Sequence, residues 1–466
     1  MVLSLKPAGF GLSTIHLANN LEREGNFMIN KEEIYGKMKS MRLPMFIMVC
    51  LCYMFTPFHR MAPAIMGPDL MKELNLTAVD FGSLGLTFMV AFAVAQAPCG
   101  ILLDRLGPRK GMTIVLMMTA VGSFMFSTAQ SLLMINVARA IIALALGGFL
   151  IGGAKIVSQW YTTSQYPVLW AMFMGFGTMG GIGATSPLQF MMTNFGWRSS
   201  FAIIAGVSVV IAILTYLILR DRPADVGLPA PDELAGEAAP AAQTAAAKSG
   251  ITAIKELVCM PKMWLSALLV IGVTSSGQAL TALWGGVFLE DVYKFSKPVI
   301  GDILFASAVG AVVGCFAAGW LMKKIKITGV LITGTAGFLL LWVYMLLSLR
   351  TLGVMELKVI MFLMGVVHMY VIACNFTLVK TLVPGELLGT GMGLVNMCAF
   401  IFGAGVFQQI WGFMINTISK GIKPFPVEAF EAAMWLQAVF LVISTICAVY
   451  FVKNLNKPAV SVSTGQ

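Results

Sequence analysis

The sequence predicts an all-α membrane protein whose twelve transmembrane helices form two six-helix bundles. Hydrophobic residues make up 58% of the 466 residues, only 11% are charged, and the mean hydropathy is +0.86. A soluble chain carries about 25% charged residues. Apolar runs of the length that crosses a bilayer, about 20 residues, recur along the chain. A polar stretch near the middle divides these runs into two groups of six.

The first half contains the N-terminal tail and the N-terminal bundle. Residues 1–42 are polar and mixed and lack a signal-peptide core, so we expect a cytoplasmic tail. Residues 43–220 are expected to form six helices. The second apolar run stops abruptly at a short charged turn, and the third starts directly after it. The predicted spans are 43–66, 81–103, 112–130, 132–156, 169–192 and 198–219.

The second half begins with a cytoplasmic linker over residues 221–262. Its alanine-rich part, 230–250, is typical of a flexible linker, and 251–262 is expected to form a short helix on the membrane surface. Residues 263–453 form the C-terminal bundle, and 454–466 a cytoplasmic tail. The predicted spans are 264–289, 299–321, 328–349, 356–380, 389–415 and 431–452.

The charge pattern sets the expected orientation. Basic loops at Arg105, Lys324 and Lys453 fall on the same side as both termini, and short basic loops stay in the cytoplasm. The net charge of +10 lies largely in loops and tails, so it does not indicate nucleic-acid binding. The eight cysteines show no zinc or redox spacing, and no catalytic constellation is present. We therefore expect neither an enzyme nor a metal or cofactor.

A turn of fixed spacing, G-x-x-x-D-R-x-G-x-R-K, separates the second and third spans. Its members are Gly100, Asp104, Arg105, Gly107, Arg109 and Lys110. Its glycines allow close helix approach, and Asp104 can pair with a cation or a helix N-terminus. A generic basic loop is the alternative. The turn resembles the signature loop between helices 2 and 3 of the major facilitator superfamily, which implies a part in a cytoplasmic gate.

The ionisable residues deep within the spans are all basic. They are His59 and Arg60 in the first span, Arg139 and Lys155 in the fourth, and His368 in the tenth. A charge inside a bilayer is costly and usually faces a cavity or a partner. Cations without carboxylates favour an anionic solute and argue against cationic drugs. Coupled protons would use His59 or His368, whereas exchange for a second anion needs no titrating group.

Each candidate binding residue also has a structural interpretation. Arg60 would reach a membrane surface if it snorkelled, Lys155 would either snorkel or act in a gate, and His368 would be a satisfied core residue. Lys155 and Gln159 share a helix face, as do His368 and Asn375. In the seventh span, Thr274, Gln278 and Thr281 form a polar stripe that either lines a cavity or packs helices, and Trp284 is either a cavity wall or an interface anchor.

Further motifs resemble the organophosphate/sugar-phosphate-permease-like branch of that superfamily. They are Tyr53-x6-Arg60 with Pro68-Asp69-Leu70, Trp160-Tyr161, Gly196-Trp197-Arg198, Arg220-Asp221-x-Pro223, and Trp284 with Phe288-Leu289. The resemblance implies that Arg60 binds the anionic group of the substrate and that Arg139 is structural. Two positions depart from the branch's sugar-phosphate antiporters. Gln278 stands where they place a second arginine, and Gln159 replaces a histidine, which favours a carboxylate over a phosphate.

These features together predict a secondary active transporter of a small organic anion, a carboxylate or sugar-phosphate-like metabolite, working by alternating access. Spans 1, 4, 7 and 10 would line its site. We expect a monomer in the bacterial inner membrane, with the lipid bilayer and protons or a counter-transported anion as further partners. Efflux of amphipathic compounds is the alternative, suggested by 33 Met and 31 Phe. A membrane sensor would need a signalling domain, and the tails and linker are short.

Overall fold

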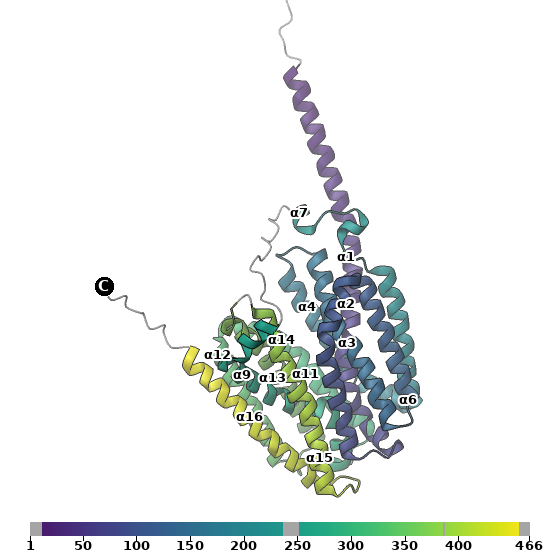
Figure 1. Cartoon of the computed structure of the whole chain (residues 1–466), viewed down its shortest axis with the longest axis vertical. Coiled ribbons are helices and arrows are strands. Elements are labelled where there is room, and N and C mark those ends of the chain that lie inside the picture. The colour runs from purple at the N-terminus through teal and green to yellow at the C-terminus, as the bar shows by residue number, and fades with distance from the viewer. Residues whose placement is uncertain (1–11, 236–250, 385–386, 456–466) are drawn as a thin grey trace, which may run out of the picture.

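The computed structural model describes residues 12–235, 251–384 and 387–455, and all regular elements in these ranges are helical (Figure 1). The predicted flexible segment up to residue 250 and the C-terminal tail lie largely outside the described residues. The helices of the first half are α1 (Leu12–Glu73), α2 (Ala78–Ser127), α3 (Leu132–Trp160), α4 (Tyr166–Thr178), α5 (Gly180–Gly183), α6 (Ser186–Ile218), η1 (Pro223–Val226) and α7 (Pro231–Ala235).

The second half contains the short helix α8 and the C-terminal bundle. Two of its elements, η2 and η4, are π-helical segments inside longer helices. The elements are α8 (Ile251–Val258), α9 (Pro261–Gln278), η2 (Ala279–Trp284), α10 (Gly285–Tyr293), α11 (Lys297–Lys324), α12 (Ile327–Leu347), α13 (Val354–Leu382), α14 (Leu388–Cys398), η4 (Ala399–Val406), α15 (Phe407–Ser419) and α16 (Val427–Leu455).

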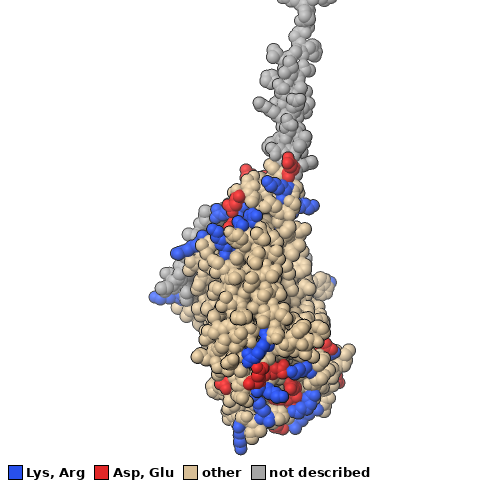
Figure 2. All heavy atoms as spheres, turned by 90° about the vertical axis from the view of Figure 1, so that its right-hand side faces the viewer, with Lys and Arg blue, Asp and Glu red and all other residues tan. Residues whose placement is uncertain are grey.

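The membrane crossings agree with the prediction of twelve. Ten segments are long and apolar enough to span a bilayer, and two of them, Ala78–Ser127 and Val168–Ile218, have 50 and 51 residues. Each of these two is broken by a glycine with positive φ, Gly107 at 77° and Gly196 at 74°. Because one crossing takes about 20 residues, each long segment supplies two. Figure 2 shows the resulting uncharged belt between two charged ends. The chain is an integral membrane protein.

The first helix differs from the prediction at its start. A polar tail is predicted before residue 43, and its described part continues the first helix, because α1 runs from Leu12 to Glu73. The reason is that no proline occurs between Leu12 and Pro44, so nothing in this stretch removes a backbone donor. The boundaries between tail, bundles and linker remain predictions.

The two bundles meet at one end and diverge at the other (Figure 1). We call the end with the Gly107 turn, Trp160 and α7 the linker face, and the end with residues 73–78 and 293–297 the opposite face. The predicted motifs fasten the turns at both ends. Trp160 Nε1 donates to the Arg220 carbonyl at 3.0 Å on the linker face. On the opposite face, Arg198 pairs with Glu73 at 2.8 Å.

The turn at Gly107 depends on the absence of a side chain. Its φ of 77° and ψ of 162° belong to a region that is open almost only to glycine. A Cβ atom here would also lie 2.5–2.7 Å from the Asp221 carboxylate. That carboxylate accepts the backbone N–H of Arg109 at 2.7 Å. The carboxylate therefore holds the turn against the end of α6, and only glycine leaves room for it.

Three Gly→Ala substitutions test this account of the turn. Gly107→Ala adds both backbone strain and a clash, so we expect a loss of about 2–3 kcal/mol. Gly196→Ala adds the strain alone, because no atom lies within 4 Å of its Cβ position, and Gly206→Ala adds neither. Thermal unfolding in detergent should rank the variants in that order. Equal melting temperatures for Gly107→Ala and Gly206→Ala would contradict the account.

Candidate functional site

A cavity of about 550 Å³ lies between the two bundles. This volume falls within the range usual for small-molecule sites. Among the described residues, its lining contains one cationic side chain, Arg60, and no carboxylate. The other polar side chains come from both bundles and are Tyr53, Thr56, Gln96, Thr178, Thr274, Gln278, Thr281, Ser307, His368 and Asn396.

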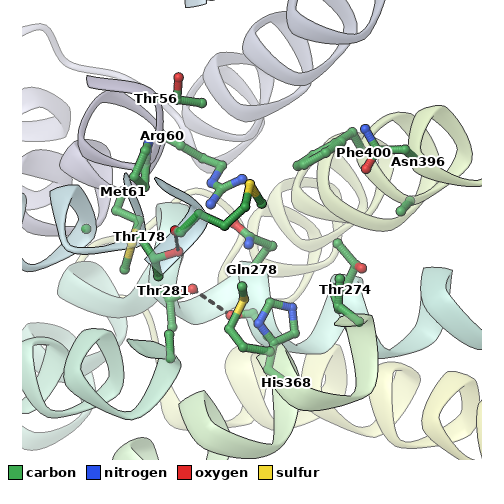
Figure 3. A pocket seen from close by; sticks show the side chains of 18 of the residues that line it. Thr56, Arg60, Met61, Thr178, Thr274, Gln278, Thr281, His368, Asn396 and Phe400 are labelled. Carbon is green, nitrogen blue, oxygen red and sulfur yellow. Dashed lines mark hydrogen bonds between the residues drawn. The ribbon is translucent and has the colours of Figure 1, made fainter. Parts of the chain in front are cut away.

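Arg60 projects from α1 toward the middle of the cavity (Figure 3). Its guanidinium carbon lies 5.6 Å from the centre of the Phe400 ring, which comes from the other bundle. Its Nε is buried and has no hydrogen-bond partner among the described residues. Tyr53 lies two helical turns earlier on the same helix and stacks on Phe173 at 4.9 Å. The cation therefore faces the cavity, with a phenol beside it.

The opposite wall carries His368 from α13 and Gln278 from α9. Both side chains are nearly buried, and neither His368 Nε2 nor Gln278 Oε1 has a hydrogen-bond partner in the described parts of the chain. Gly277 permits the close approach of the imidazole, because a Cβ there would lie 2.5 Å from His368 Cδ2. In Figure 3 the Arg60 side chain points toward Gln278 and His368.

Both π-helical segments border the cavity. Thr281 lies in η2 and Phe400 in η4, and both line the site. The Thr281 hydroxyl donates to the Gly277 carbonyl at 2.7 Å, one turn back along the helix. Such segments are rare and occur frequently at functional sites, since the extra residue per turn redirects side chains.

Lys155 and Gln159, predicted to bind the solute, do not line this cavity. Lys155 forms an ion pair with Asp104 of the Gly100–Lys110 turn near the linker face. The expectation that cations within the spans lack carboxylate partners is therefore wrong for Lys155. The turn's carboxylate and the lysine come from neighbouring helices of one bundle. Arg109 of the same turn donates to the Tyr216 carbonyl at 2.7 Å and stacks on its ring.

Three other predicted residues are buried away from the cavity. His59 packs among Phe58 and other aromatic rings of the N-terminal bundle. Asn375 accepts a hydrogen bond from Ser266 at 3.1 Å. Trp284 donates to the Gln408 carbonyl at 3.1 Å and lies within the contact between the bundles.

Arg139, expected to be structural, ties three helices of one bundle together. Its guanidinium donates to the carbonyls of His59 at 3.0 Å and Leu84 at 3.3 Å. It also lies 4.3 Å from the centre of the Phe88 ring. Because its donors are directed at backbone oxygens, this arginine is placed to fix α1 and α2 against α3.

Polar contacts between the bundles gather at the opposite face. Lys297 pairs with Asp69 of the predicted Pro68-Asp69-Leu70 motif. Lys423 donates to the carbonyls of Met71 at 3.2 Å and Leu76 at 2.6 Å, which end α1. Burial lowers the pKa of Lys423, but the nearby Asp291 and Asp80 carboxylates counteract this effect.

Backbone contacts close the same region. A Cβ at Gly286 would lie 2.0 Å from the Ala64 carbonyl oxygen, and one at Gly412 would lie 2.5 Å from that of Ala78. Trp284 packs edge-on against Phe81 at 5.2 Å between ring centres. The bundles are thus in direct contact at the opposite face. The cavity lining instead extends along helices α4 and α14 of the linker face, so this conformation opens toward that face.

Sequence reasoning missed several lining residues. They include Thr56, Met61, Thr178, Asn396 and Phe400. Thr56 and Met61 share the cavity-facing side of α1 with Arg60, so helical periodicity around that residue carried a usable signal. Thr178 lies in α4, within the fifth predicted span, and Asn396 and Phe400 lie in α14 and η4, within the eleventh. The expected set of lining spans omitted both. For these, no charge or motif marked the position.

Comparison with known proteins identifies the family. The family model described as Major Facilitator Superfamily matches residues 49–408. The chain belongs to the major facilitator superfamily. It is a multi-spanning secondary transporter of this superfamily rather than an enzyme.

Individual relatives are more distant. Membrane sensor protein UhpC of Escherichia coli (strain K12) is 25% identical over 302 residues, covering 64% of this chain and 68% of that protein. The probable L-galactonate transporter of the same organism is 30% identical over 158 residues, covering 32% and 33%. A solved bacterial homologue of the human lysosomal transporter Spinster, in an inward-facing and unoccupied conformation, has a TM-score of 0.70. It is 16% identical and covers 89% of this chain and 98% of its own, which supports the shared fold.

The position of Lys155 gives a testable expectation. Lys155→Gln should change the affinity for any stabilising anion by less than about threefold, since the side chain pairs with Asp104 outside the cavity and exposed pairs contribute about 0–1 kcal/mol. Isothermal titration of the purified variant measures this. A tenfold or larger loss, matched by Asp104→Asn, would place the pair in the binding site after all.

A cross-link tests the contact at the opposite face. In the double variant Asp69→Cys/Lys297→Cys of solute-free protein, a short thiol-reactive bismaleimide should link the two cysteines in most molecules, because the native side chains bridge this gap as an ion pair. Mass spectrometry of the linked peptide measures the yield, and each single variant serves as the control. Free cysteines that react with maleimide and do not cross-link would show that the bundles are apart at this face.

Proposed function

We propose that this protein transports a small organic anion across the bacterial inner membrane, and that Arg60 binds the anionic group. Tyr53, Gln278 and His368 complete the site from both bundles. Both termini lie in the cytoplasm, so the linker face is cytoplasmic and the cavity opens inward. The protein works as a monomer, and protons or a second anion supply the coupling.

The observation that supports this proposal is that Arg60 is the single cation, and that no carboxylate occurs, among the described residues that line the cavity. A charged arginine at mid-membrane costs on the order of 3 kcal/mol even on the more favourable scales. Arg139 offsets such a cost with carbonyl oxygens, whereas Arg60 has its guanidinium over Phe400 and along the cavity. A bound anion would offset the cost at Arg60. The solute shifts the conformational equilibrium to the extent that this gain differs between the two conformations.

The same residues suit alternating access. Arg60 belongs to α1, while Gln278 and His368 belong to the other bundle, so an anion held by Arg60 lies between both. Movement of the two bundles about the Arg60 site would expose the bound anion first to one face of the membrane and then to the other. The contacts at Lys297 and Lys423 would have to open in that step.

Efflux of amphipathic compounds is the second candidate, because six methionines line the cavity. Flexible thioether side chains adapt to varied apolar surfaces. Such a solute would bind without help from Arg60.

A thermal-shift screen with carboxylates and phosphate esters tests the proposal. Arg60→Gln should weaken the binding of the anion that stabilises the wild type by about thirtyfold or more, because a desolvated charge pair is lost. Arg350→Gln is the matched control, since this arginine pairs with Glu428 at the surface. Uptake into proteoliposomes should fall in parallel. Stabilisation by neutral amphipaths that is equal in the wild type and in Arg60→Gln would favour efflux instead.

A further inference from the structure

The wall of the cavity is chemically uneven. One cation stands against an extensive sulfur-rich apolar surface, which both bundles contribute. Its methionines are Met61, Met174, Met361, Met364, Met369 and Met392. Besides Arg60, the described lining residues include no ionisable group of either sign other than His368 and Tyr53. A solute that fits this wall has little charge and much apolar surface.

The other membrane cations of the N-terminal bundle are already engaged. Lys155 pairs with Asp104, and Arg139 donates to two backbone carbonyls. Neither lines the cavity. A second negative charge on the solute would therefore meet no arginine or lysine besides Arg60 in the described lining, and burying an unpaired charge is strongly unfavourable.

The surroundings of Arg60 also favour an apolar group next to the anion. The Phe400 ring lies 5.6 Å from the guanidinium carbon and packs edge-on against Phe92 at 5.2 Å. These two rings come from different bundles and line the cavity, and the Phe400 ring lies against the guanidinium. A flat or branched hydrocarbon attached to a carboxylate would lie against Phe400 while the carboxylate meets Arg60.

We propose that the solute is an organic monoanion with an apolar body, an aromatic or branched aliphatic monocarboxylate. Its carboxylate binds Arg60, and its body packs on Phe400 and the methionine wall. This inference rests on the proposed function, because it assumes that the solute is an anion held by Arg60. It specifies in addition that the solute carries one negative charge and that the rest of its surface is apolar.

Matched ligands test the inference on the full-length purified protein. Phenylacetate, acetate, malonate, glycerol 3-phosphate and the neutral phenylacetamide are compared by thermal-shift titration. Phenylacetate should bind about tenfold or more tightly than acetate, since its ring is removed from water. Malonate and glycerol 3-phosphate should bind more weakly than phenylacetate, and phenylacetamide should not compete.

Two variants on one helix separate the apolar wall from general stability. Met364→Gln keeps the shape of the side chain but makes the wall polar, so it should reduce the preference for phenylacetate over acetate by about fivefold. Met355→Gln changes an exposed methionine at the start of α13 and should leave the preference unchanged.

The outcomes distinguish this inference from the proposed function. If malonate or glycerol 3-phosphate binds best and Arg60→Gln abolishes that binding, the anion site stands and the apolar monoanion is wrong. If phenylacetate and phenylacetamide bind equally and Arg60→Gln changes neither, both are wrong. Absence of any stabilisation by monocarboxylates also overturns the inference.

Discussion

The rest of this structure depends on an arginine between two bundles that meet through aromatic packing, an ion pair and backbone contacts. Arg60 lies on the helix that packs against both halves of the molecule, and its charge is directed into the cavity. Its neighbour His59 is turned into the aromatic core, where its carbonyl is bound by Arg139. Adjacent residues thus have different roles, because one face of α1 packs within its own bundle and the other lines the cavity.

Closure at the opposite face is achieved largely by the absence of side chains. Gly286 and Gly412 bring backbones of the two bundles into contact, and the ion pair between Asp69 and Lys297 lies beside them. These particular contacts form and separate without repacking large side chains, whereas the edge-on contact of Trp284 with Phe81 at the same face has to open as well. A transporter must make and break one of its faces in each cycle, so small residues suit this position better than an interdigitated core.

The sequence was sufficient for the fold and only partly sufficient for the site. Apolar length predicts the twelve crossings, because each helix must satisfy its backbone within the bilayer. Charge likewise singles out Arg60. Charge alone does not predict the role of Lys155. The partner of this lysine, Asp104, lies on another helix, and an ion pair between helices leaves no pattern in the local sequence. Phe400 was also missed, because an aromatic residue in a span looks the same whether it faces lipid, core or cavity.

The pairing of Lys155 with Asp104 bears on how the linker face would close. The Asp104 side chain is 69% exposed, so its ion pair with Lys155 contributes about 0–1 kcal/mol. The neighbouring Arg109 is held more firmly, through the Tyr216 carbonyl and the stacked ring. The turn is therefore fixed by Arg109 and Gly107, while Asp104 is free to exchange partners at little cost. Any closure of this face would move Asp104 together with the turn, and its ion pair with Lys155 would oppose that movement little.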